Sequence, residues 1–111
     1  VNPEFSTASP LGWHDRGTNG GKSSATIGNN VYAQENFNGL PSWENNYRPE
    51  GGASLKFDFP IDFTKQPKEY IDAAVTNLFY WSNIVHDIFY QYGFDEVSGN
   101  FQEDNFGKGG K

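Results

Sequence analysis

The sequence contains no cysteine, which excludes disulfides, thiol nucleophiles and cysteine-ligated zinc sites within its 111 residues. It contains no methionine either, so it does not start at an initiator residue. Its first residues, VNPEF, lack the basic-then-apolar pattern of a signal peptide. We therefore expect a processed or excised piece of a longer protein.

Positive charge and long apolar runs are also scarce. Fourteen Asp and Glu against eight Lys and Arg give a formal net charge of −6. Because no basic cluster occurs, nothing in the sequence points to a nucleic-acid partner. No apolar run approaches the roughly 18 residues that a membrane span needs. Hydrophobic residues make up 35% of the chain, below the roughly 45–50% of an ordinary globular domain. Most of the large ones lie between Leu55 and Phe106.

What the chain has instead is aromatic residues, at 17% of the total, which argues against disorder. A long helix is predicted from Pro67 to Tyr92. Pro67 suits the first helical position, where a backbone N–H would be unpaired anyway, and Thr64 upstream is an acceptable cap. Gly93 suits the left-handed stop position. At about 1.5 Å per residue, some 25 residues give a helix roughly 38 Å long.

The predicted helix is apolar over most of its circumference. Residues that recur at the three- and four-residue spacing of one helical face are Ile71, Ala74, Val75, Leu78, Val85, Ile88, Phe89 and Tyr92. Phe79, Trp81 and Ile84 extend this surface. The polar side is narrow and consists of Thr76, Asn77, Tyr80, Asn83, Asp87 and Gln91. A helix of this kind is buried on most sides, so we expect partners that this short chain does not supply.

The other predicted elements are few and short. Ala25 to Ile27 and Val31 to Gln34 flank Gly28-Asn29-Asn30, residues that tolerate positive φ, and this pattern indicates a hairpin. The alternation from Ser54 to Phe59 predicts a half-buried strand. Aromatic anchors in the remaining loops include Trp13, Trp43, Tyr47, Phe101 and Phe106.

The predicted fold class is α+β, with short antiparallel strands and aromatic loops packed on one long central helix. We expect residues 1–111 to form a single incomplete domain. Residues 1–66 are its loop-rich β segment, 67–93 its helix, and 94–111 a loop with a Gly/Lys tail.

Two histidines are the first candidates for chemistry. His86-Asp87 lies mid-helix, with Asn83 and Tyr90 at neighbouring turns, and His86 would serve as a metal ligand or general base. Successive helical residues point about 100° apart, so these two cannot hold one ion together. A buried polar group that fixes helix packing is the favoured interpretation. His14 lies in a loop, and a turn residue is the favoured interpretation. The alternative is that it joins His86 in a small metal site.

An acidic cluster follows the helix and consists of Asp95, Glu96, Glu103, Asp104 and Asn105. Oxygen ligands of this kind can hold calcium, although the spacing does not match an EF-hand and a solvated loop is favoured. The sequence has no H-E-x-x-H, no G-x-S-x-G, no phosphate-binding glycine loop and no Cys/His zinc pattern. We therefore assign no catalytic, cofactor-binding or metal-ligating residue within this chain.

Several phrases agree in order and spacing with one family. Those on and after the helix are Asn77-Leu78-Phe79-Tyr80, Asn83, His86-Asp87, Tyr92-Gly93-Phe94 and Gly99-Asn100-Phe101. Those upstream are Ala8-Ser9-Pro10-Leu11-Gly12-Trp13-His14-Asp15, Gly28-Asn29-Asn30-Val31-Tyr32-Ala33-Gln34 and Asn46-Tyr47-Arg48-Pro49. With these phrases, which cover essentially all 111 residues, the chain resembles the fungalysins, secreted fungal zinc metallopeptidases related to thermolysin.

The resemblance implies the N-terminal subdomain of a thermolysin-like catalytic domain that acts outside the cell. In the family, an H-E-x-x-H helix and a downstream Glu hold zinc, and zinc-activated water attacks a peptide bond of a protein substrate. None of these residues can be assigned here. Zinc would be held by the C-terminal remainder, beyond Lys111, and the chain alone would be inactive. The Gly/Lys tail would be a place for proteolysis.

The alternative interpretation is a non-catalytic binding or structural module that acts through its aromatic surface. Neither interpretation involves a membrane or a nucleic acid as partner.

Overall fold

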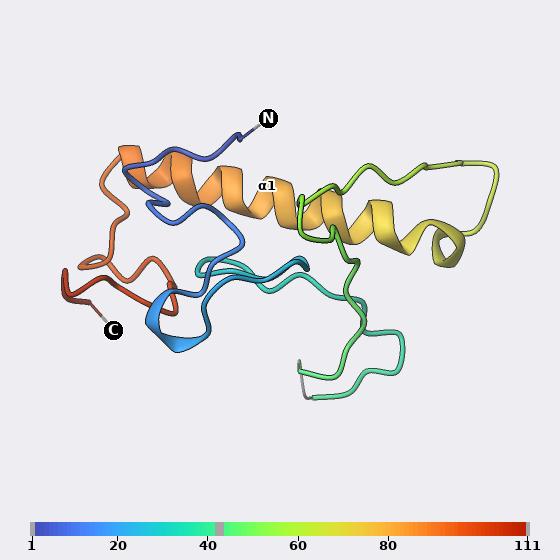
Figure 1. Ribbon diagram of the computed structural model, residues 1–111, viewed down its shortest axis with the longest axis horizontal. Coiled ribbons are helices and arrows are strands. Elements are labelled where there is room, and N and C mark those ends of the chain that lie inside the picture. The colour runs from blue at the N-terminus through green and yellow to red at the C-terminus, as the bar shows by residue number, and fades with distance from the viewer. Residues whose placement is uncertain (1, 42–43, 111) are drawn as a thin grey trace.

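The computed structural model describes residues 2–41 and 44–110, so Trp43 and Lys111, named above, lie outside the described residues. One helix, α1, covers Ile71–Gln91 and is entered through the 3₁₀ turn η2, Pro67–Tyr70. A second 3₁₀ turn, η1, covers Gly17–Asn19. The helix runs along the long axis of the molecule, and the other segments pass beside it as loops (Figure 1). The predicted long helix is therefore confirmed.

The start of the helix differs from the prediction in its cap. Pro67 lies in the first turn as expected, but the cap is Gln66, which forms a reciprocal capping box with Glu69. Thr64, the predicted cap, instead donates its hydroxyl to Asp62 Oδ1 at 2.6 Å. A local hydrogen bond of this kind competes with capping.

The end of the helix is the predicted one. Gly93 adopts a left-handed φ of 98°. Its N–H donates to the carbonyl of Tyr90 at 3.1 Å, and the N–H of Phe94 donates to the carbonyl of Phe89 at 3.0 Å. These two bonds form a Schellman motif and satisfy carbonyls that the helix end would otherwise leave unpaired.

Sheet structure is sparser than predicted. Within the described ranges, strand pairing consists of three isolated antiparallel bridges, Asp15–Lys22, Ala25–Glu50 and Ile27–Tyr32. Of the expected hairpin, the Ile27–Tyr32 bridge is formed, with one backbone hydrogen bond on either side of it. The turn at residues 28–30 uses no positive φ. Two short segments without a neighbouring strand do not extend into a stable ladder.

The predicted strand at Ser54–Phe59 is wrong, because this segment begins with a turn. The N–H of Leu55 donates to the carbonyl of Gly52 at 3.0 Å, and Leu55 has a left-handed φ of 52°. Phe57 and Phe59 are half-buried, but Leu55 is exposed. The alternating apolar residues of this segment therefore correspond to two half-buried aromatic side chains, and they do not form a strand.

The core lies along one side of α1 and is small, being formed by Trp13, Ala33, Val75 and Phe79. The buried residues of α1 itself are spaced one turn apart and are Val75, Phe79, Asn83 and Asp87. Asn83 and Asp87, which the sequence places on the narrow polar side of the helix, are 0% and 1% exposed. This face of the helix is therefore turned inward, with its polar residues inside.

The apolar face that the sequence predicts as buried is mostly exposed to solvent among the described residues. Its exposed members are Ala74, Leu78, Trp81, Val85, Ile88, Phe89 and Tyr92. The prediction that Phe101 is a buried anchor is also wrong, since 83% of the residue's surface is exposed. Trp13 is a buried anchor as expected.

The close approach of Gly28 to the backbone of Trp13 can be tested by substitution. A Cβ added there would lie 1.6 Å from the carbonyl oxygen of Trp13. We expect Gly28→Ala to lower the free energy of unfolding by about 3 kcal/mol or more, because backbone in the core must move. The control is Gly39→Ala, at a left-handed position with no atom within 4 Å, which should cost about 1–2 kcal/mol. Urea denaturation followed by circular dichroism compares them, and equal losses would contradict the close approach.

Candidate functional site

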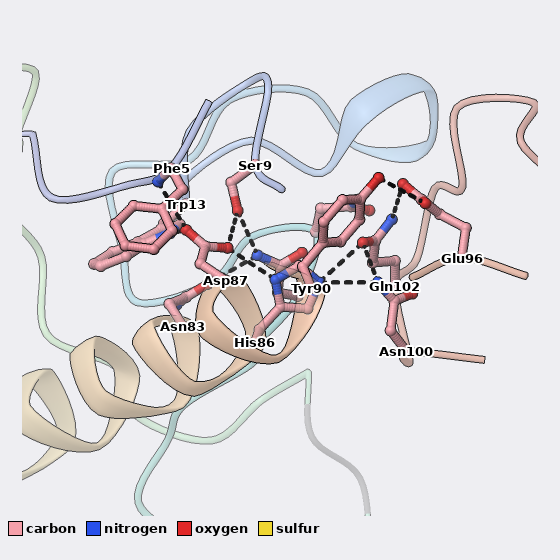
Figure 2. A network of polar contacts seen from close by, with 12 residues as sticks. Phe5, Ser9, Trp13, Asn83, His86, Asp87, Tyr90, Glu96, Asn100 and Gln102 are labelled. Carbon is pink, nitrogen blue, oxygen red and sulfur yellow. Dashed lines mark hydrogen bonds and ion pairs between the residues drawn. The ribbon is translucent and has the colours of Figure 1, made fainter. Parts of the chain in front are cut away.

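The buried carboxylate of Asp87 lies at the centre of a polar network (Figure 2). Its Oδ2 accepts the N–H of Phe5 at 3.0 Å and the indole N–H of Trp13 at 2.9 Å. Its Oδ1 accepts the hydroxyl of Ser9 at 2.6 Å and lies 2.9 Å from His86 Nδ1. Three of these four partners come from the N-terminal segment, which is thereby tied to the middle of α1.

The ionisation of Asp87 reflects two opposed effects. Burial disfavours the charged carboxylate, whereas the hydrogen bonds from His86, Ser9, Trp13 and Phe5 favour it. The hydrogen bonds prevail, and the pKa of Asp87 is held below its ordinary value. The group is a charged centre of packing.

His86 has no ring nitrogen to offer to a metal or substrate. Its Nδ1 faces Asp87, and its Nε2 lies 2.9 Å from Oε1 of Gln102 and 3.3 Å from Nδ2 of Asn100. The side chain is 8% exposed. This geometry matches the interpretation of His86-Asp87 as a buried polar group that fixes helix packing.

A second line of contacts joins α1 to the loop after Gly28. The amide of Asn30 donates to the hydroxyl oxygen of Ser9 at 3.0 Å and to Oδ1 of Asn83 at 3.1 Å. Asn83 in turn donates to the carbonyl of Phe79 at 2.9 Å. Sequence reasoning missed Asn30 as a partner. The available signal was that Asn83 and Asp87 lie one turn apart, on the same helical face as Val75 and Phe79.

The network continues into the loop after the helix (Figure 2). Glu96 is 2% exposed and accepts the hydroxyl of Tyr90 at 3.0 Å. The ammonium of Lys108 lies 3.5 Å from Glu96 Oε1. Burial opposes ionisation of Glu96, but hydrogen bonds from its own backbone, Tyr90 and Gln102, with Lys108 nearby, hold its pKa below the usual range. Asn100 and Gln102, both buried, were not recognised from the sequence.

The rest of the acidic cluster is spread over separate partners. Glu103 forms a bidentate pair with Arg16, both contacts at 2.8 Å, and also accepts the hydroxyl of Tyr32. Asp104 Oδ2 accepts the N–H and hydroxyl of Thr18, each at 2.9 Å. The remaining members act within turns, since Asp95 accepts the N–H of Ser98 and Asn105 that of Lys108. Their oxygens do not converge as calcium ligands would.

His14 lies apart from this network. Its ring stacks on Phe57 with centroids 5.0 Å apart and lies 4.8 Å from the ring of Phe79. Its Nδ1 is 2.8 Å from the carbonyl oxygen of Ala25, which can only accept, so Nδ1 carries the proton. A cavity of about 770 Å³ opens beside it. His14 and His86 thus have different surroundings, and the small metal site that would combine them is not formed.

Taken together, the described part of the chain contains no group of three or more His, Asp or Glu side chains placed to hold a metal ion. What the polar network can do is bind segments of the chain to one another. None of the helices in residues 2–41 and 44–110 has the length and apolarity required to cross a membrane.

Asp87 can be tested by removing its charge. In Asp87→Asn, an amide N–H₂ faces donors that have no other acceptor, so we expect a loss of about 3–5 kcal/mol in the free energy of unfolding. Asp72→Asn is the matched control on the same helix, where the carboxylate accepts the exposed hydroxyl of Tyr47, and it should lose about 1 kcal/mol or less. Urea denaturation followed by tryptophan fluorescence measures both, and equal small losses would contradict a central role for Asp87.

His14 predicts a pH dependence. Burial lowers its pKa below the ordinary 6.5, although the hydrogen bond to Ala25 and the charge of Glu4 oppose this. Because the unfolded chain then takes up the proton more readily, stability should fall as the pH drops below about 6.5. His14→Phe keeps a ring in the stack and should fall less steeply between about pH 7 and 5.5. Unfolding curves at several pH values give the two slopes, and identical slopes would rule out this contribution.

Comparison with known proteins agrees with the resemblance. The family model described as Fungalysin metallopeptidase (M36) matches residues 1–111. The chain is 50% identical over 112 residues to the probable extracellular metalloproteinase 1 of Arthroderma benhamiae and to extracellular metalloproteinase 1 of Trichophyton rubrum. It is 46% identical over 110 residues to extracellular metalloproteinase 5 of Trichophyton tonsurans.

These alignments cover 99–100% of this chain but only 17–18% of each relative's length. The predicted family is thereby confirmed, and the chain belongs to the fungalysin (M36) metallopeptidase family.

Proposed function

We propose that the chain is the N-terminal part of a secreted zinc metalloendopeptidase that hydrolyses peptide bonds in proteins. The observation that carries the proposal is a family match over the whole chain that spans only 17% of relatives named extracellular metalloproteinases. Such a stretch leaves most of a peptidase, including its metal site, to the rest of the polypeptide. Secretion rests on the relatives' names.

The residues of this chain do not fit the zinc that the family implies. Both ring nitrogens of His86 are occupied, His14 is held in an aromatic stack, and the described residues place no group of three His, Asp or Glu side chains to hold a metal. We therefore propose that zinc is held by residues of the remainder. Calcium is the weaker proposal, because Glu103 and Asp104 would first have to leave Arg16 and Thr18.

The contribution of this chain is structural. We propose that residues 1–111 belong to one incomplete domain, in which the polar network holds α1, the N-terminal segment and the loop after the helix together. The partner of this domain is then the C-terminal remainder, and the substrates of the whole enzyme are proteins or peptides. The second candidate, a binding module without catalysis, draws on the exposed aromatic residues, such as Trp81 at 56% and Phe101 at 83%.

One experiment separates these functions. The whole polypeptide should hydrolyse casein, lose this activity in a chelator and regain it with zinc, whereas residues 1–111 alone should be inactive under all three conditions. Peptide release measured by chromatography and mass spectrometry provides the readout. A whole polypeptide that is folded and zinc-loaded but does not cleave protein would support the binding module and overturn the peptidase.

A further inference from the structure

The outward side of α1 carries a continuous apolar stripe. At 100° per residue, its members occupy one arc of the helix and are spaced by four and three residues in turn. They are Ala74, Leu78, Trp81, Val85, Ile88 and Tyr92, with Phe89 beside them. No polar or charged residue interrupts this arc. Trp81 is 56% exposed and Tyr92 is 87% exposed.

The polar network fixes the stripe in its outward position. Asp87 and Asn83 are held on the opposite side of the helix by Ser9, Trp13 and Asn30. Rotating α1 to bury the stripe against this chain would expose these groups or leave them unpaired, and each lost buried partner is expensive. The described part of the chain therefore cannot cover the stripe itself.

An apolar surface of this length does not belong on the exterior of a soluble monomer. Its composition resembles a domain interior cut in half, which is the character of permanent contacts. The chain's acidic groups are absent from it, so a charged partner is not favoured. The partner that fits the stripe is therefore an apolar protein surface that covers it permanently.

We propose that the stripe docks onto the remainder of the same polypeptide and forms the permanent interface between this segment and the rest of the peptidase; this rests on the proposed function. The relatives extend far beyond the aligned 17%, so sufficient chain exists to cover it.

The test uses the whole polypeptide with a photo-cross-linking residue, Val85→p-benzoylphenylalanine. The control is Gln91→p-benzoylphenylalanine, an exposed position on the same helix outside the stripe. After irradiation, mass spectrometry should find position 85 joined, within one molecule, to peptides beyond residue 111. Cross-links only to a second molecule, or none at all, would overturn the proposal.

A second measurement uses charge. Val85→Glu should lower the melting temperature of the whole polypeptide by about 5 °C or more, because a carboxylate would be buried, and Gln91→Glu by less than about 2 °C. Equal shifts would overturn the proposal. Hydrolysis of casein is assayed on the same wild-type preparation. Cross-linking without hydrolysis would refute the proposed activity and leave the interface standing, whereas hydrolysis without cross-linking would refute the interface alone.

Discussion

A buried carboxylate is the constraint on which this structure depends. Taking an ionised carboxylate out of water costs several kcal/mol unless hydrogen bonds replace the lost solvent. Asp87 meets this requirement with four donors, three of which come from residues 5–13. The N-terminal segment must therefore lie against the middle of α1, and Trp13, the largest side chain of the small core, is placed by the same contact. One charge thus organises segments that are more than 70 positions apart in the sequence.

The same requirement divides α1 into two unlike sides. A surface helix usually turns its polar residues to water and its apolar stripe to the core. Here Asn83 and Asp87 are inside, while Trp81 and Val85 are outside. The chain's own core is small, and much of its cohesion comes from the polar network and from local turns. This division is what is expected of a segment that completes its folding against the rest of a larger protein.

The sequence predicted the elements of this structure better than their orientation. Pro67 and Gly93 bounded the helix correctly because their effects are local. Periodicity identified an apolar face but could not say which side this chain covers, since that depends on partners far away in sequence. His86 was expected to be a buried, hydrogen-bonded group, which its geometry matches, but nothing in the sequence identified Asn100 and Gln102 as its partners. Phe101, held at a positive φ between these two buried neighbours, points outward for a reason that only the network reveals.

If the outward stripe of α1 is buried in the whole polypeptide, Trp81 is shielded from solvent there. Fluorine NMR of the whole polypeptide labelled with 5-fluorotryptophan tests this directly, with resonances assigned by Trp→Phe substitution. Trp13, buried within this chain, provides the internal standard for a dry indole. We expect the resonances of Trp13 and Trp81 both to stay unchanged when H₂O is replaced by D₂O. A solvent isotope shift at Trp81, with none at Trp13, would contradict it.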